Sequence, residues 1–161
     1  MEEETSMFKK KENYQVPTND GTVSCSRKIH FCYGHRVWKH ESKCAHLHGH
    51  NAVIWVHAKA PQLDKQGRVI DFSVIKNKIG GWIDQFWDHG FIYFVDDKET
   101  EKALDMMRTQ KMFPLPYNPT AENLAKFIVD VVSPQLFKGT NITIFKVEFY
   151  ETENCSATYE I

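Results

Sequence analysis

This chain of 161 residues lacks the features that mark several large classes of protein. Its charges nearly balance, at a formal net charge of -1, so it lacks the basic excess of a nucleic-acid binder and we expect no nucleic-acid partner. Its apolar runs are far too short to span a bilayer, so we expect no membrane partner. The acidic start, Met1-Glu2-Glu3-Glu4, lacks the basic and then apolar pattern of a secretory signal.

Paired cysteine motifs are also missing. The four cysteines are Cys25, Cys32, Cys44 and Cys155, and none of them forms a Cys-x-x-Cys pair. Without an export signal, this pattern indicates free thiols in a reducing compartment rather than a disulfide framework. We therefore expect a cytoplasmic protein.

The length and the hydrophobic content of 42% suit one globular domain with a modest core. Residues 1–20 are rich in Lys, Glu, Asn and Thr and show little apolar periodicity. This composition predicts a loose N-terminal leader over 1–20. With no internal repeat and no linker, the remainder, 21–161, is predicted to be a single domain.

Alternation of apolar and polar residues predicts four strands, near 23–35, 50–59, 142–151 and 157–161. Two helical patterns lie between the second and third strands, so the predicted order is β-β-α-α-β-β. Strands grouped at both ends of the chain around paired helices favour an α+β fold with an antiparallel sheet.

The two predicted helices are amphipathic. The first carries one apolar stripe along 72–86. The second spans 121–132, with Thr120 or Asn118 as its N-cap, and Pro134 is expected to end it.

The stretch Cys44–Asn51 concentrates metal-binding chemistry. His48 and His50 are two residues apart, and the apolar run Ala52–Ala58 follows them directly. In a strand, alternate side chains point to the same face, so both imidazoles would leave one face about 7 Å apart along the chain. That separation suits two corners of a tetrahedral zinc ion. The alternative is a His-Gly-His turn with solvated histidines.

A catalytic zinc site needs three protein ligands and an open position. His35 is the best third ligand, because it ends the preceding strand and a hairpin would bring it beside the other two. His30, His40, His46 and His57 are also available, so spacing alone does not single out His35.

Cys44 lies four residues before His48, close enough to line the same pocket. It could be the fourth ligand of a closed structural site, or a free thiolate beside a three-histidine zinc, and Cys32 could play either part. A thiol near a cation loses its proton more readily and can then act as a base near neutral pH.

Two further positions have both a chemical and an ordinary interpretation. Asp88-His89, at the end of the first helix, is either a relay in which the carboxylate orients the imidazole, or a histidine favoured by the helix dipole. Glu151 follows Tyr150 at a strand end. Its carboxylate could accept two N–H bonds from the guanidine-like edge of a pterin or guanine, or it could be solvated.

Six short fragments in register resemble the family of 6-pyruvoyltetrahydropterin synthase and its relative, 6-carboxytetrahydropterin synthase of the queuosine (7-deazaguanine) pathway. They cover nearly everything except the leader. The fragments are Phe31–Arg36, Lys43–Asn51, Val69–Phe72, Asp88–His89, Asn118–Asn123 and Tyr150–Tyr159.

The resemblance implies a zinc-dependent lyase that acts on a small pterin triphosphate, 7,8-dihydroneopterin triphosphate. It assigns a role to nine residues. These are His35, His48 and His50 as zinc ligands, Cys44 as general base, Asp88 with His89 as a second acid/base element, Glu151 as the anchor of the pterin ring, and Thr120 and Glu122 near the pocket.

The fold implied by the resemblance is the tunnelling fold, with a four-stranded antiparallel sheet and two helices packed on one face. Such domains form trimers that close their sheets into a barrel and stack as hexamers, with active sites between subunits. The implied partner is therefore a second copy of the chain, in a trimer or a dimer of trimers.

One spacing separates the two activities within the family. The cysteine of the 6-carboxy type precedes the first histidine of His-x-His by four residues, as Cys44 precedes His48 here, whereas the pyruvoyl type has a longer insert. We therefore predict formation of 6-carboxy-5,6,7,8-tetrahydropterin with acetaldehyde and triphosphate. The alternatives are a 6-pyruvoyltetrahydropterin synthase of a tetrahydrobiopterin-type pathway and, in another class, a non-catalytic zinc-stabilised pterin-binding module.

Overall fold

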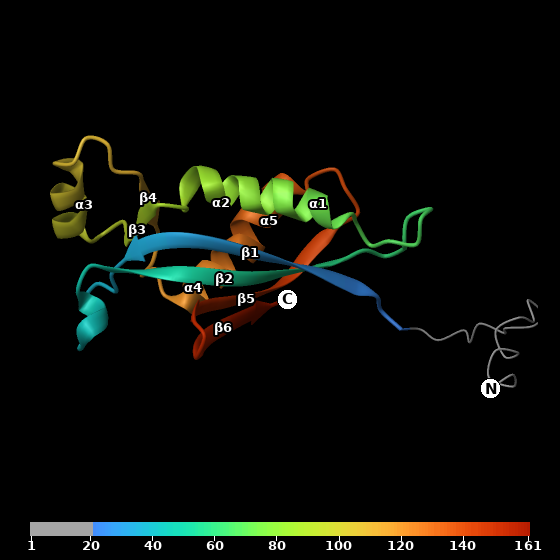
Figure 1. Cartoon of the computed structure of the whole chain (residues 1–161), viewed down its shortest axis with the longest axis horizontal. Coiled ribbons are helices and arrows are strands. Elements are labelled where there is room, and N and C mark those ends of the chain that lie inside the picture. The colour runs from blue at the N-terminus through green and yellow to red at the C-terminus, as the bar shows by residue number, and fades with distance from the viewer. Residues whose placement is uncertain (1–20) are drawn as a thin grey trace, which may run out of the picture.

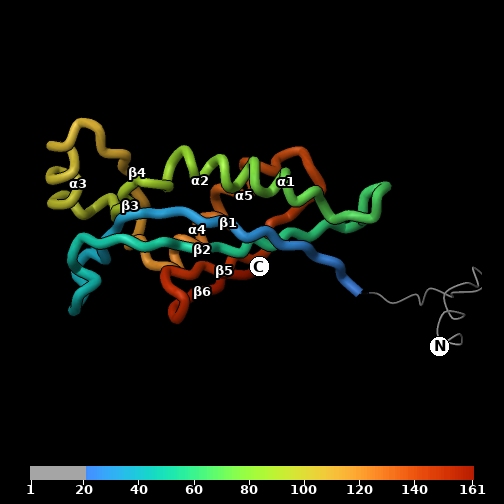
Figure 2. The backbone as a smooth tube through the Cα atoms, in the orientation of Figure 1, coloured from blue at the N-terminus to red at the C-terminus, as the bar shows by residue number. Residues whose placement is uncertain are grey.

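The centre of the fold is a long hairpin made by β1 (Ser24–His35) and β2 (His48–Lys59). The computed structural model describes residues 21–161, so the predicted leader lies outside the described residues. The two strands pair in antiparallel register along their whole length, from Ser24 opposite Lys59 to His35 opposite His48. The connecting loop, which includes the short helix η1 (Lys43–Ala45), extends beyond the end of the sheet, in cyan in Figure 2.

The sheet has six strands in the order β4-β3-β1-β2-β5-β6. Its other strands are β3 (Gly90–Phe94), β4 (Met112–Leu115), β5 (Thr143–Thr152) and β6 (Cys155–Glu160). β1, β2, β5 and β6 are antiparallel, as predicted. β3 and β4 extend the sheet in parallel, with β3 beside the end of β1. The predicted plain four-stranded sheet and β-β-α-α-β-β order are therefore wrong.

Both additional strands lack the pattern by which a half-exposed strand is recognised. Nearly all of β3 is buried, so its residues do not alternate between apolar and polar. β4 contains Pro114, which cannot donate a hydrogen bond and normally argues against a strand. Here β4 is an edge strand, where a proline is tolerated.

Two long helical segments cover one face of the sheet, as expected (Figure 1). The first is made of α1 (Phe72–Ile75), η2 (Lys76–Gly80) and α2 (Gly81–Phe86), and the second of α4 (Ala121–Phe127), η3 (Ile128–Val132) and α5 (Ser133–Leu136). A shorter helix, α3 (Lys98–Asp105), comes between β3 and β4 in the sequence. Within residues 21–161, no helix combines the length and the apolar character needed to cross a membrane.

The second helical segment does not stop at Pro134. A proline inside an α-helix clashes with the carbonyl four residues before it and removes a hydrogen bond. Here a π-type turn, η3, comes immediately before α5, which begins at Ser133. The Ser133 hydroxyl donates to the carbonyl of Ile128 at 2.7 Å. The wider turn accommodates the ring, and the segment continues to Leu136.

The apolar core lies between this helical layer and the inner face of the sheet. Alternate residues of the central hairpin, among them Phe31 and Tyr33 on β1 and Ala52 and Ile54 on β2, are buried in one cluster with both helical segments. By the same alternation, His35 continues the buried row of β1. The buried row of β1 therefore ends in a histidine at this end of the core.

Arg36, directly after His35, attaches α3 to the end of β1. Its guanidinium donates to both oxygens of Asp97, at 2.7 and 2.6 Å, and to Glu99 at 2.9 Å. Asp97 also accepts bonds from the Thr100 hydroxyl and N–H. Burial alone would raise the pKa of Asp97, but the hydrogen bonds from Arg36 and Thr100 lower it below its ordinary value.

Replacing Arg36 with Met is expected to lower the free energy of unfolding by about 3–5 kcal/mol, because it leaves the Asp97 carboxylate, only 1% exposed, without its cation. Urea denaturation measures the loss. The matched control is Arg68→Met, whose ion pairs with Asp64 and Asp71 are exposed and should contribute less than about 1 kcal/mol. Equal losses in the two variants would contradict a special role for the buried pair.

Candidate metal centre and pocket

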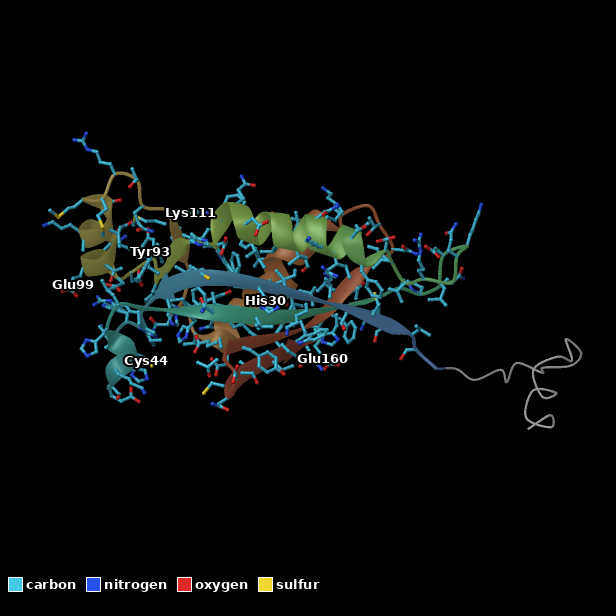
Figure 3. All side chains as sticks on the ribbon, viewed as in Figure 1. His30, Cys44, Tyr93, Glu99, Lys111 and Glu160 are labelled. Carbon is cyan, nitrogen blue, oxygen red and sulfur yellow. The ribbon has the colours of Figure 1, made fainter. Side chains whose placement is uncertain are left out.

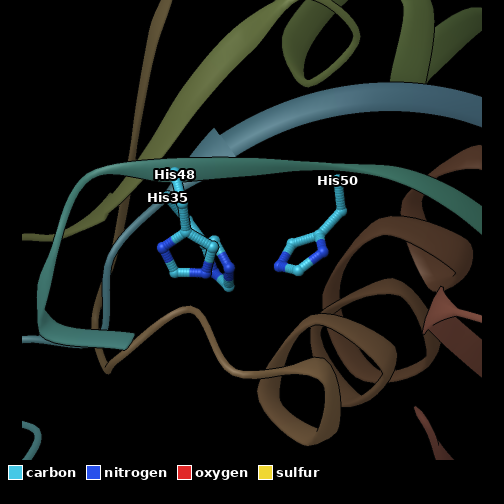
Figure 4. A group of neighbouring side chains, drawn as sticks. All are labelled: His35, His48 and His50. Atoms are coloured by element: carbon cyan, nitrogen blue, oxygen red, sulfur yellow. The ribbon is translucent and has the colours of Figure 1, made fainter. Parts of the chain in front are cut away.

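Three imidazoles meet at the end of the central hairpin. The register puts His35 opposite His48 and Tyr33 opposite His50, so all four rings lie on the core-facing side. The three histidine rings have centroids 4.5 to 5.1 Å apart. One ring nitrogen from each lies within 4.8 Å of the other two. Figure 4 shows the three rings pointing to the same side of the hairpin.

The hydrogen bonds of the histidines leave nitrogens free on the inside of this cluster. Nδ1 of His35 donates to the carbonyl of Pro119 at 2.7 Å, and Nδ1 of His48 donates to the carbonyl of His46 at 2.7 Å. Because a carbonyl only accepts, both rings carry their proton on Nδ1 when neutral, and Nε2 keeps its lone pair. Nε2 of His35 and Nε2 of His50 are buried without a hydrogen-bond partner among the described residues.

The electrostatics also keep the imidazoles of His35 and His50 neutral. Burial lowers the pKa of His35 to about 4, against the hydrogen bond to Pro119, and the neighbouring His48 and His50 lower it further. The pKa of His50 is lowered as well, chiefly by burial. Neutral imidazoles with unpartnered nitrogens are the donors that zinc prefers, and His35 and His50 provide two of them. With His48, whose ring nitrogen lies within 4.8 Å of theirs, the cluster fits such an ion.

A pocket of about 630 Å³ opens in front of the histidine cluster. The other sequence-predicted residues that line it are Cys44, Thr120, Glu122 and Glu151. Cys44 is not among the residues whose ligand atoms lie within 4.8 Å of one another. Of the alternative histidines, His40 lines the pocket but is not part of the cluster either.

Cys44 reaches the pocket from the loop between β1 and β2. It lies in η1, and its carbonyl accepts a hydrogen bond from the N–H of Val37 at 2.8 Å, which closes the base of the loop. Figure 3 shows Cys44 on this loop, beyond the end of the sheet. Cys44 therefore lines the same pocket as the imidazoles without belonging to their cluster.

Glu151 is held against the metal-ligand candidates by Tyr33. The Tyr33 hydroxyl donates to Oε1 of Glu151 at 2.9 Å. The carboxylate oxygens lie 3.7 Å from Nε2 of His35 and 4.0 Å from Nε2 of His50. Burial, with the charge and hydrogen bond of Glu151, raises the pKa of Tyr33 far above its ordinary value, so the tyrosine stays a donor.

Asp88 and His89 form a pair, but they do not line this pocket. Oδ2 of Asp88 accepts from Nδ1 of His89 at 2.8 Å, and Oδ1 accepts from the N–H of Cys32 at 2.8 Å. Burial alone would raise the pKa of Asp88, but the bonds from Cys32 and His89, with the charge of Lys111, lower it. His89 has a left-handed backbone, with φ of +55°, and its side chain is 78% exposed.

Several residues of the site were not predicted from the sequence. Tyr33, which binds Glu151 but does not line the pocket, could have been found, since it precedes His35 by two residues and shares its face. Cys155 pairs with Thr152 across the β5–β6 turn, so it depends on a register that the sequence does not state. The other unpredicted lining residues are Val37, Ala121, Thr152, Ser156 and Ala157.

Sequence comparisons identify a family and named relatives. A family model described as 6-pyruvoyl tetrahydropterin synthase matches residues 24–161. The 6-carboxy-5,6,7,8-tetrahydropterin synthase of Rickettsia felis is 41% identical over 133 residues, covering 83% of this chain and 96% of the relative. The enzyme of the same name from Aquifex aeolicus is 33% identical over 156 residues, covering 84% of this chain and 96% of the relative.

Solved structures share the fold. An uncharacterized protein from Wolinella succinogenes superposes with a TM-score of 0.71 at 23% identity, covering 86% of this chain and 98% of that one. The 6-pyruvoyl tetrahydropterin synthase of Caenorhabditis elegans gives a TM-score of 0.62 at 21% identity, covering 88% and 96%. With the family match over 24–161 and relatives of up to 41% identity, the chain belongs to the 6-pyruvoyl tetrahydropterin synthase family.

Proposed function

We propose that this chain is a zinc-dependent lyase that converts 7,8-dihydroneopterin triphosphate to 6-carboxy-5,6,7,8-tetrahydropterin, with release of acetaldehyde and triphosphate. The strongest support is one pocket lined by the three imidazoles, the Cys44 thiol and the Glu151 carboxylate. The names of the Rickettsia felis and Aquifex aeolicus relatives support the 6-carboxy product. The spacing of four residues between Cys44 and His48 agrees with it.

Two alternatives remain to be tested against this proposal. A 6-pyruvoyltetrahydropterin synthase would use the same residues but stop after triphosphate elimination. A non-catalytic zinc-stabilised pterin-binding module would need the histidines and Glu151 but neither Cys44 nor the Asp88–His89 pair. The joint presence of these groups favours an enzyme.

Substrate binding is assigned to Glu151 and the pocket walls. The Glu151 carboxylate, held by the Tyr33 hydroxyl, accepts N–H bonds from the pyrimidine edge of the pterin. Thr120 and Glu122, at the start of α4, line the same pocket. When bound by the three histidines, zinc supplies a Lewis acid that lowers the pKa of the substrate's side-chain hydroxyls.

Proton transfer is assigned to Cys44 and His89. The Cys44 thiolate removes a proton from the substrate side chain, and His89 returns one. Asp88 accepts from Nδ1 of His89, so Nε2 is the nitrogen that takes up a proton and delivers it to the substrate side chain. Triphosphate leaves, and cleavage of the side chain, in which a water molecule supplies the second oxygen of the carboxyl group, releases acetaldehyde. We place this reaction in queuosine synthesis and, because it needs a free thiol, in the reducing cytoplasm.

We also propose a homo-oligomer, a trimer or a dimer of trimers, with active sites between subunits. The exposed His89 side chain lies outside the pocket that contains Cys44, which supports completion of each site by a second copy. Among the described residues, β6 has no partner strand on its outer side. Within residues 21–161, the outer side of β1 is also unpaired before Tyr33, because β3 pairs with β1 only at Tyr33–His35. These two edges are available for pairing between copies.

Metal analysis of the purified protein is expected to find roughly one zinc ion per chain. His48→Ala should abolish stoichiometric zinc because it removes one of three ligands, as measured by mass spectrometry of the metal content. His40→Ala is the matched control, since it removes an imidazole that lines the pocket but lies outside the cluster. Zinc retained by H48A and lost by H40A would contradict the ligand assignment.

Incubation of the zinc-loaded protein with 7,8-dihydroneopterin triphosphate tests the function itself. We expect 6-carboxy-5,6,7,8-tetrahydropterin and acetaldehyde, identified by mass, because the relatives and the cysteine spacing favour that product. A pyruvoyl product without acetaldehyde would select the first alternative. Tight pterin binding with no turnover would select the non-catalytic module.

Cys44→Ala is expected to lower turnover by about 10²- to 10⁴-fold while zinc content and melting temperature stay unchanged, because the thiol acts as a base and not as a ligand. Steady-state kinetics and metal analysis measure the two effects. Cys155→Ser, which alters another thiol lining the pocket, should lose far less activity. Loss of zinc from C44A would instead identify a closed structural site.

Mixing C44A with a His89→Ala variant extends this test to the assembly. If sites form between copies, an interface that takes Cys44 from one subunit and His89 from the other regains both groups, and activity returns. If each chain completes its own site, the mixture stays inactive.

A further inference from the structure

Asn118 has no part in the chemistry proposed above, yet its side chain is bound on both of its polar atoms. Oδ1 accepts from the N–H of Trp38 at 2.8 Å, and Nδ2 donates to the carbonyl of Trp38 at 3.1 Å. The two residues are 80 positions apart in the sequence. One amide thus satisfies both backbone groups of a single loop residue, as a neighbouring strand would.

On one side, Asn118 belongs to the segment that orients His35. The next residue, Pro119, provides the carbonyl that accepts from Nδ1 of His35 at 2.7 Å. The segment is itself fixed, because the carbonyl of Asn118 accepts from the Thr120 N–H and from Nδ2 of Asn123, each at 2.9 Å. The Pro119 carbonyl therefore has a defined direction relative to the start of α4.

On the other side, Asn118 binds the base of the loop that carries Cys44. Val37 donates its N–H to the carbonyl of Cys44 at 2.8 Å, and Trp38 is the next residue along. The two bonds to Trp38 therefore hold the loop just where it closes. Asn118 is therefore covalently linked to Pro119, whose carbonyl accepts from the His35 ring, and hydrogen-bonded to the loop that carries Cys44.

We propose that Asn118 is a positioning residue that fixes the Cys44 loop relative to the His35 imidazole. The proposal rests on the proposed function, in which these two groups act on one substrate. Metal-binding histidines generally depend on the acceptor of their other ring nitrogen, and loss of such a partner typically costs 10- to 100-fold in metal affinity or activity. Asn118 couples that acceptor to the position of a second reactive group.

Asn118→Asp tests this coupling with a side chain of nearly the same shape. One oxygen can still accept from the Trp38 N–H, but the other now faces the Trp38 carbonyl, so an attractive contact becomes repulsive. Two quantities are measured: the rate of Cys44 alkylation by iodoacetamide, followed by peptide mass spectrometry, and the zinc affinity, followed by competition with a chelator.

We expect Cys44 in N118D to be alkylated about fivefold faster, because the loop opens more often, and zinc affinity to fall about tenfold. The matched control is Asn141→Asp, the same chemical change at an exposed position outside the pocket. Both quantities should stay at the wild-type level in N141D. Alkylation of Cys44 in N118D at the N141D rate would overturn the proposal.

The alkylation measurement needs neither metal nor substrate. If the wild-type protein binds no zinc, the proposed function fails, while the alkylation rates still decide the role of Asn118. If N118D does not fold, Asn118→Gln takes its place, because it keeps both polar groups and displaces them by one methylene. Faster alkylation of Cys44 in a folded N118Q would support the role, and an unchanged rate would reject it.

Discussion

The antiparallel register between β1 and β2 is the constraint on which the rest of the site depends. Because side chains alternate across a strand, a slip of one residue would turn the histidines of β2 to the solvent face. In the observed register, His35 faces His48 and Tyr33 faces His50. The same alternation that buries the aliphatic rows of the hairpin thus delivers four polar rings to one end of the core.

Within residues 21–161, two buried polar atoms at that end of the core have no hydrogen-bond partner, Nε2 of His35 and Nε2 of His50. A buried polar atom without a partner is costly. A cation held there would compensate both. The start of α4 contributes to the same region. The Pro119 carbonyl orients the His35 ring, and Thr120 both caps α4 and lines the pocket.

Alternation within long strands and the capping of α4 could be predicted from the sequence, because both depend on residues close together in the chain. The choice of His35 over four other histidines could not, since it depends on the register of the hairpin. The sequence also allows two interpretations of Cys44, and only the structure shows that the residue lies outside the ligand cluster. β3 and β4 were missed because uniform burial and Pro114 conceal them. That Asp88 and His89 lie outside the pocket of Cys44 likewise follows only from the tertiary structure.

The backbone of His89 has a consequence for the evolution of this protein. A side chain in the left-handed region costs roughly 1–2 kcal/mol that a glycine would not. The chain accepts this strain at an exposed position, where the imidazole does little for packing. Selection for stability alone would therefore favour replacing His89 with glycine, and so removing the ring to which we assign proton transfer.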